Sequence, residues 1–245
     1  MPRCRVEYFS ESLQMATAMT LILPDPAVKG PYFTLYQLHG LSDDHTIWTR
    51  RTSIERYVHG LPILVVMPDG GRGWYTDALE GDAYESHIMT DTLGFVEKFF
   101  PVRKNRAGRA IGGLSMGGYG ALKLALKYPQ TFASVAAHSS AFLPWGGSRP
   151  FAPERERIFG VEATGGPNDV FALAESLAGL DAPAIRFDCG RSDALLAVNR
   201  RFHRHLLKLG VKHTYAEYPG GHEWDYWDRH FPKALKHHRR GHYAP

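Results

Sequence analysis

A serine at position 115 lies in a glycine-rich stretch, residues 113–117 (GLSMG), that matches the pattern G-x-S-x-G. The apolar run 110–114 before it is typical of a strand, and the run 118–127 after it is typical of a helix. In so tight a turn, side chains two positions before and after the serine would collide, so both positions need glycine. The pattern favours a nucleophilic serine over an incidental serine in a structural turn, and it places the hydroxyl above the sheet.

A nucleophilic serine needs a base and a carboxylate that orients the base. On a turn of this type the three follow in the order serine, acid, histidine. The chain has 13 histidines, so position must decide among them. We predict that His222 is the base, because it lies in a glycine loop (YPGGHEWDYW) between the last apolar run and the last helix-like run. His138 lies upstream of any acid that fits this order.

Two aspartates compete for the role of the acid. Asp188 falls inside the predicted strand 184–189, where it favours a structural partnership, and Asp193 falls in the loop that follows. A loop residue at the carboxyl end of a strand can reach the histidine, so Asp193 is the predicted acid. Asp193 also precedes the helix-like run 194–209 and could serve as its N-cap, a role compatible with the first.

The oxyanion of an acyl-transfer reaction needs two backbone N–H donors. One is predicted at Met116, directly after the serine, and the other at Leu41, in the loop after the third strand. Gly40 permits the backbone to approach a ligand closely. We interpret His39 as a hydrogen-bonding residue beneath the site rather than as a proton carrier.

The elements that must position these residues recur at a regular spacing. Segments 5–9 and 15–23 predict two antiparallel strands at the start. The other expected strands are 32–38, 63–67, 110–114, 132–136, 184–189 and 213–218, and the expected helices are 46–58, 85–99, 118–127, 194–209 and 223–237. Alternating strands and helices indicate an α/β fold with a mostly parallel central sheet and helices on both faces.

One stretch interrupts this alternation. Residues 142–181 carry four prolines and several glycines, with helix expected only at the two ends. We interpret 142–181 as a cap-like insertion over the active-site end of the sheet, within a single domain that spans 1–245. A length of 245 residues is compatible with one α/β domain.

The composition of the chain limits the classes of binding partner that it is expected to have. The net charge of +4 is a mild excess, and only the tail (KALKHHRRGHYAP) is visibly basic, which favours a solvated helix end over a nucleic-acid or metal site. No signal-peptide pattern and no membrane-spanning apolar run is visible, and Cys4 and Cys189 are too few for a disulfide framework. We therefore expect a cytoplasmic protein without metal, cofactor, nucleic-acid or membrane partner. The sequence is compatible with a homo-oligomer and does not determine the oligomeric state.

Large aromatic residues fall near the predicted site. Trp74 and Tyr75 follow the strand 63–67, Trp48 follows the predicted oxyanion loop, and Trp145 lies in the insertion. We predict that these four residues bind substrate, because large rings leave room for a short acyl group while offering an apolar face to a sugar-like alcohol. The alternative is that they only pack the core.

With these residues placed, the chain resembles the esterase D-like group of α/β-hydrolases, closest to its tributyrin esterase and acetyl esterase branch. The segments LHGLSDDHTIWTRRTSIERY, LPILVVMPDGGRGWYTD, GGLSMGGYGALKLALKYP, DCGRSD and GGHEWDYW fit in order over nearly the whole chain. The resemblance implies Ser115 as nucleophile, Asp193 as acid and His222 as base. It also implies Leu41 and Met116 as oxyanion donors.

The expected function is a cofactor-free serine carboxylesterase that acts on short-chain, acetyl-like esters through an acyl-enzyme. Alternatives are a formylglutathione hydrolase, a feruloyl or acetylxylan esterase, or an acyltransferase on the same fold. Formylglutathione hydrolases carry a reactive cysteine near the oxyanion loop, and residues 41–48 contain none. A non-catalytic binding scaffold would lack a member of the triad, and a peptidase of this fold would carry a gating domain.

Overall fold

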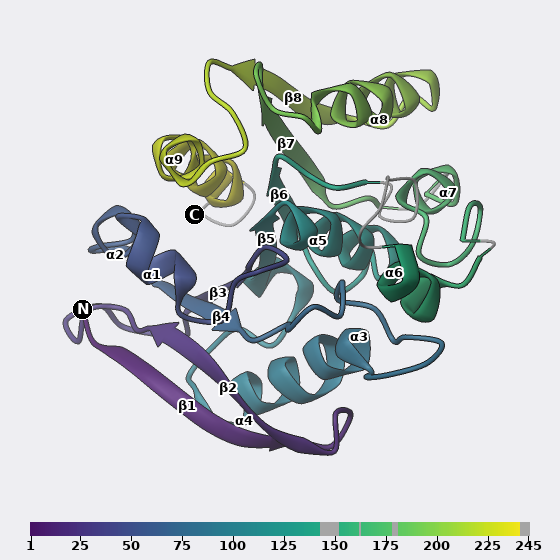
Figure 1. The fold of residues 1–245 in the computed structure, drawn as a ribbon. Helices are drawn as coiled ribbons and strands as arrows, with labels where there is room; N and C mark the ends of the chain where they lie inside the picture. The colour runs from purple at the N-terminus through teal and green to yellow at the C-terminus, as the bar shows by residue number, and fades with distance from the viewer. Residues whose placement is uncertain (143–151, 162, 178–180, 241–245) are drawn as a thin grey trace.

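Eight strands form one sheet in the order β1-β2-β4-β3-β5-β6-β7-β8 (Figure 1). The computed structural model describes residues 1–142, 152–161, 163–177 and 181–240. The strands are β1 (Arg3–Ser10), β2 (Met15–Ile22), β3 (Phe33–Leu38), β4 (Ile63–Pro68), β5 (Arg109–Leu114), β6 (Ser134–His138), β7 (Ala184–Gly190) and β8 (His213–Tyr218). β1, β2 and β4 pair antiparallel, and every other pairing is parallel. The predicted mostly parallel sheet is confirmed.

Burial along the strands follows from their place in the sheet. Every residue of β3, β4 and β6 is buried, as expected for interior strands covered on both faces. β1 lies at one edge, and exposed residues recur along it. Continuous apolar runs therefore predicted the central strands, and alternation predicted the hairpin.

Helices cover both faces of the sheet. They are α1 (Ile47–Arg51), α2 (Ile54–Tyr57), α3 (Tyr84–Ser86), η1 (His87–Thr92), α4 (Leu93–Phe99), η2 (Arg106–Gly108), α5 (Met116–Lys127), α6 (Ala152–Phe159), α7 (Val170–Glu175), α8 (Leu196–Lys208) and α9 (Trp224–Arg240). Figure 1 shows α1, α2 and α9 on one side of the sheet and α4, α5 and α8 on the other. Two clusters of buried apolar side chains correspond to these two faces.

Two predicted helices are not continuous. The segment 46–58 is divided into α1 and α2 at Thr52, whose backbone is extended, and the Ser53 N–H donates to Asp228 of α9 at 2.7 Å. The segment 85–99 contains the π-helical turn η1, from which Thr92 hydrogen-bonds the Tyr8 hydroxyl of β1 at 2.8 Å. Both interruptions depend on contacts with distant parts of the chain, which local periodicity does not encode.

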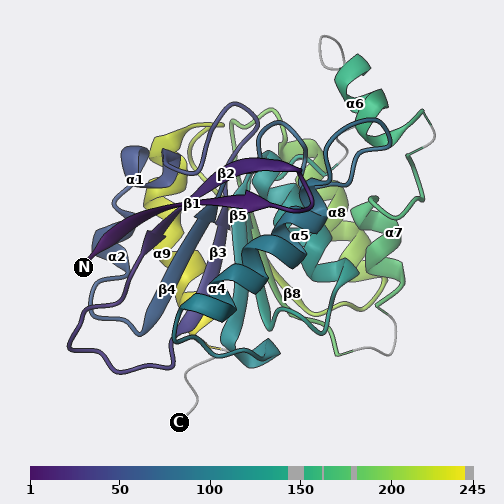
Figure 2. The same cartoon turned by 90° about the horizontal axis from the view of Figure 1, so that it is seen from below.

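The predicted insertion divides into two parts. α6 stands away from the sheet (Figure 2) and pairs with the loop after β4, where the Leu79 N–H donates to the Ile158 carbonyl at 3.1 Å. α7 packs instead on α5 and α8 and belongs to the helical layer. The expectation of helix only at the two ends of 142–181 is thus wrong, because α6 lies inside the segment.

Candidate functional site

Ser115 occupies the turn between β5 and α5 in a strained conformation. Its φ is 53° and its ψ is −116°, in a region that residues other than glycine rarely adopt. The turn is held by the neighbouring strand, because the Ser115 N–H donates to the His138 carbonyl at 2.9 Å. The Ser115 carbonyl in turn accepts hydrogen bonds from Tyr119 and Ala141, at 3.0 and 3.2 Å.

The two glycines that flank Ser115 are required by close backbone contacts. A Cβ on Gly113 would lie 2.4 Å from the Gly117 carbonyl oxygen, so a side chain cannot be placed there. A Cβ on Gly117 would lie 2.5 Å from the His39 carbonyl oxygen. The second glycine therefore also allows the start of α5 to approach the loop that follows β3.

Ser115, His222 and Asp193 form a chain of hydrogen bonds. His222 Nε2 lies 3.1 Å from Ser115 Oγ, and His222 Nδ1 lies 2.9 Å from Asp193 Oδ2. The carboxylate can only accept, so Nδ1 carries the proton and Nε2 is free to accept one from the serine hydroxyl. The arrangement can therefore deprotonate Ser115 as it attacks a carbonyl carbon.

Exposure differs along this chain. The His222 side chain is 36% exposed, whereas that of Asp193 is fully buried. Burial raises the pKa of Asp193, but hydrogen bonds from the His222 ring and the Leu195 N–H outweigh it and hold the pKa below its usual range. The Asp193 carboxylate is therefore held in its ionised form.

The loops after β7 and β8 are tied together by their backbones, which brings Asp193 to His222. The Arg191 N–H donates to the Tyr218 carbonyl at 2.8 Å, and the Ser192 N–H donates to the Gly220 carbonyl at 3.0 Å. The Leu195 N–H bonds Asp193 Oδ1 at 2.8 Å, so the same aspartate also caps the turn before α8.

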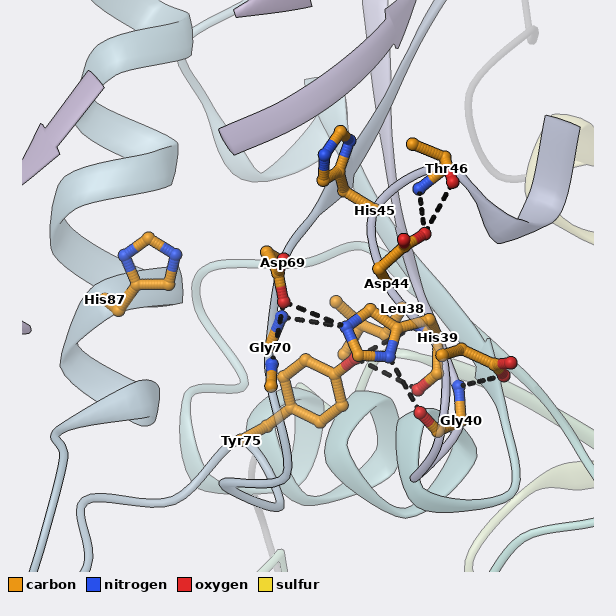
Figure 3. Close-up of polar contacts among 12 residues, drawn as sticks. Leu38, His39, Gly40, Asp44, His45, Thr46, Asp69, Gly70, Tyr75 and His87 are labelled. Carbon is orange, nitrogen blue, oxygen red and sulfur yellow. Dashed lines mark hydrogen bonds and ion pairs between the residues drawn. The ribbon is translucent and has the colours of Figure 1, made fainter. Parts of the chain in front are cut away.

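The loop after β3 is fixed by the imidazole of His39 (Figure 3). His39 Nε2 accepts from the Gly70 N–H at 2.8 Å, so Nδ1 donates to the Gly40 carbonyl at 2.7 Å. The buried ring leaves the serine region to His222, in keeping with its interpretation as a hydrogen-bonding residue. Within the described part of the chain, the N–H groups of Leu41 and Met116 donate no hydrogen bond to the protein.

The other aspartate of β7 has a different set of partners. Asp188 is fully buried and accepts from His138 Nδ1 at 2.8 Å, Arg186 at 2.9 Å and the Tyr226 hydroxyl at 3.0 Å. Burial raises its pKa, but the charges and hydrogen bonds of His138 and Arg186 outweigh this and keep the pKa below its usual range. Asp188 contacts neither Ser115 nor His222 in these hydrogen bonds.

The predicted aromatic residues lie deeper than a binding surface. Trp48 has no exposed surface and donates from Nε1 to the Leu38 carbonyl at 3.0 Å. Tyr75 is also fully buried, with its hydroxyl on the backbone of His39. The complete burial of Trp48 and Tyr75 favours the alternative that these two rings pack the core, and substrate binding by them stays a prediction.

Of the two remaining tryptophans predicted to bind substrate, the structure describes Trp74. Trp74 is 5% exposed and packs edge-on against Tyr119 and Phe159, with ring centroids 5.9 and 6.1 Å away. Phe159 belongs to α6 and Tyr119 to α5, so Trp74 connects the predicted cap with α5. Trp145 lies outside the described residues.

Sequence reasoning missed a group that supports the histidine. The Trp227 ring lies edge-on to His222, with centroids 5.0 Å apart, and its Nε1 donates to Ser139 Oγ at 3.1 Å. The Ser139 side chain in turn helps to lower the pKa of Asp193. The helical spacing of Trp224 and Trp227 after the histidine was the available signal. The positive φ of Ser139, 48°, leaves no mark in the sequence.

The described residues contain no candidate for a membrane span or for a metal site. No helix there is both long and apolar enough to cross a bilayer. That part of the chain also holds no group of three or more His, Cys, Asp or Glu side chains arranged for a metal ion.

The family model named Esterase matches residues 10–238. The chain is 29% identical to an acetyl esterase of Caldicellulosiruptor saccharolyticus over 95% of this chain and 96% of that protein. It is 31% identical to Esterase Rv1288 of Mycobacterium tuberculosis, with 78% of this chain aligned. It spans about half, 48%, of that longer protein.

Solved structures share the whole fold. The fluorophosphonate-binding serine hydrolase FphF of Staphylococcus aureus superposes with a TM-score of 0.89 at 29% identity, covering 97% of this chain and 98% of that one. The S-formylglutathione hydrolase FrmB of the same organism gives 0.87 at 30% identity with the same coverage. A ferulic acid esterase gives 0.83 at 27% identity over 98% of both chains.

Proposed function

The chain belongs to the Esterase family and is a carboxylesterase of the α/β-hydrolase fold, and from this premise we propose that Ser115, His222 and Asp193 form its catalytic triad. His222 takes the Ser115 proton as the oxygen attacks the ester carbonyl. Asp193 orients and stabilises the imidazolium, and His222 then protonates the departing alcohol. Water, activated by His222, releases the acid from the acyl-enzyme.

The observation that carries this proposal is the continuous hydrogen-bond chain from Ser115 Oγ through His222 to Asp193, with distances of 3.1 and 2.9 Å. It begins at a strained serine, where stored backbone strain is a common feature of nucleophiles. The N–H groups of Leu41 and Met116 are proposed to bind the oxyanion. Met116 begins α5, so the positive end of the helix dipole adds to its N–H.

The proposed substrate is a small ester with a short, acetyl-like acyl group; a sugar-like alcohol is one candidate for its other half. Similarity to an acetyl esterase over nearly the full length of both proteins supports the short acyl group. The packing of Trp74 between Tyr119 and Phe159 supports it as well, because these fixed rings restrict space near the nucleophile helix. We propose that residues 1–245 act as one domain, with α6 as its cap.

A second candidate is hydrolysis of a formylglutathione thioester, favoured by the 30% identity to FrmB. The absence of cysteine in residues 41–48 argues against it. A feruloyl ester is supported by a less similar structure. Transfer of the acyl group to a bound alcohol instead of water uses the same triad, and product analysis with added alcohols separates the two reactions.

The test combines a covalent label with a substrate panel. Wild-type protein and Ser115→Ala are treated with a fluorophosphonate, then assayed on nitrophenyl acetate, an acetylated sugar, a feruloyl ester and S-formylglutathione. Ser115→Ala should not be labelled and should lose about a million-fold in kcat. Ser176→Ala, an exposed distal serine, is the matched control and should behave as wild type. If Ser115→Ala were still labelled and kept its turnover, the nucleophile would be a residue other than Ser115.

A further inference from the structure

The Tyr75 hydroxyl makes two hydrogen bonds to the backbone of a single residue in the loop after β3. It accepts from the His39 N–H at 3.0 Å and donates to the His39 carbonyl at 3.0 Å (Figure 3). Tyr75 is fully buried, so water cannot replace it on either group. The hydroxyl therefore sets the backbone position of His39, two residues before Leu41.

The Tyr75 ring fits between two glycines from different elements. A Cβ on Gly70 would lie 2.3 Å from the ring, and a Cβ on Gly120 of α5 would lie 2.4 Å from it. Gly70 also donates its N–H to the His39 imidazole at 2.8 Å. The ring thus fills the space between the loop after β4 and the helix that begins with Met116, with its hydroxyl on His39 in the loop after β3.

The backbone of Tyr75 is anchored to the same helix. Trp74 and Tyr75 both have positive φ, 53° and 52°, so this loop needs external support. Lys123 of α5 is fully buried and donates from Nζ to the Tyr75 carbonyl at 2.5 Å and to Thr76 Oγ1 at 3.0 Å. Its charge is balanced by Glu85, 2.5 Å away.

We propose that Tyr75 is a positioning residue of the oxyanion hole, which sets the distance between the N–H groups of Leu41 and Met116. The inference rests on the proposed function. One donor comes from the His39 loop and the other from the first residue of α5, and Tyr75 is bonded to the first element and anchored on the second. Gly117 brings the two elements into direct contact as well, through the His39 carbonyl.

The predicted effect appears in the transition state rather than in substrate binding. An oxyanion donor contributes only as negative charge develops, and losing one costs about a hundred- to a thousand-fold in kcat. A displaced donor is a partial loss. Tyr75→Phe keeps the ring and removes the hydroxyl, so kcat should fall about ten- to a hundred-fold while KM stays within about two-fold.

The experiment compares Tyr75→Phe with Tyr8→Phe, which also loses a buried hydroxyl hydrogen bond, to Thr92 at 2.8 Å, but on the β1 side of the molecule. For each protein, kcat, KM, Tm and the pH profile of kcat/KM are measured on nitrophenyl acetate. An alkyl trifluoromethyl ketone, whose hemiketal oxyanion occupies the hole, provides a second readout. Its Ki should rise in Tyr75→Phe about as much as kcat falls, with an unchanged pH profile. Tyr8→Phe should have a lower Tm than wild type but the same kcat, KM and ketone Ki.

The outcomes separate the two proposals. An active wild type with unchanged kcat and ketone Ki in Tyr75→Phe overturns this inference alone, as does an equal fall of kcat in Tyr8→Phe. A wild type that hydrolyses no ester contradicts the proposed function first. If Tyr75→Phe fails to fold, Thr76→Val removes one anchor of the same loop, and it should show a smaller fall in kcat with a rise in the ketone Ki of matching size. Unchanged values there overturn the inference.

Discussion

Asp188 and Asp193 lie on either side of the end of β7, and each accepts a hydrogen bond from Nδ1 of a different histidine. Asp188 pairs with His138 at 2.8 Å, and Asp193 pairs with His222 at 2.9 Å. Of these two imidazoles, that of His222 hydrogen-bonds the Ser115 hydroxyl, whereas His138 contacts Ser115 through its backbone carbonyl. The end of β7 therefore supplies the carboxylates of two similar carboxylate–imidazole pairs, of which one faces the candidate nucleophile and the other is enclosed.

Replacing each carboxylate with an amide should separate their roles. Asp193→Asn should lower kcat by about ten-thousand-fold, the effect seen in a serine protease triad, because the amide favours the wrong imidazole tautomer. Asp188→Asn should retain most activity and instead unfold at lower denaturant, because a buried charge network loses its anion, at a cost of about 3–5 kcal/mol. Steady-state kinetics and urea unfolding of both variants give the ranking. The reverse ranking would assign the acid to Asp188.

Which parts of this site could be predicted depends on how local the signal is. Ser115 and His222 follow from glycine-rich turns at the ends of apolar runs, and such turns are defined within a few residues. Asp193 could be separated from Asp188 because one follows the predicted strand and the other lies in it. The parallel strands were predictable because burial on both faces demands unbroken apolar runs.

The remaining features depend on long-range contacts. Nothing in the sequence near Tyr75 shows that its hydroxyl would bond His39, or that Gly120 of α5 would make room for its ring. Trp48 follows the predicted oxyanion loop but packs in the core against Trp224 and Phe231. Residue type and order place such aromatics near the site, and only the packing of distant elements decides which way they face.

The rate should depend on pH through one group. His222 must be neutral to accept the Ser115 proton, so kcat/KM should rise with pH along a single limb and then level off. Asp193 should add no second limb to this profile, because its hydrogen bonds keep its pKa below the value usual for an aspartate. A pH–rate profile on nitrophenyl acetate measures this. A chelator should leave the profile unchanged, and inhibition that added zinc reverses would count against the mechanism.

Folding stability should depend on pH through a different histidine. Burial lowers the pKa of His230 from 6.5 to about 4, and the charges of Lys233 and Arg229 act in the same direction, against Asp188. Between these two pH values the unfolded chain binds a proton that the folded chain does not. Stability should therefore fall as pH drops from 6.5 to about 4, by about 3 kcal/mol in total.

His230→Phe keeps the ring stacked on Tyr218, at a centroid distance of 4.2 Å, and removes the titration. Urea unfolding at several pH values in this window should show a shallower loss of stability in His230→Phe than in wild type. His59→Gln changes an exposed histidine and should keep the wild-type slope. Equal slopes in all three proteins would assign the acid sensitivity to other groups.

The acyl chain length should be limited by Trp74. Its buried ring packs between Tyr119 of α5 and Phe159 of α6, so an acyl chain that extends from Ser115 along α5 would meet packed aromatic side chains. Each methylene that a pocket accepts is worth about 1–3 kcal/mol, so an open pocket would show kcat/KM rising steadily with length. We expect the highest kcat/KM between acetyl and butyryl esters, measured with nitrophenyl esters of two to twelve carbons.

Trp74→Ala should move the maximum of kcat/KM to longer acyl chains. Trp48→Phe, a change on the other face of the sheet, should lower Tm and leave the preferred acyl chain length unchanged. A wild-type maximum at eight carbons or beyond would show that Trp74 does not limit the acyl group.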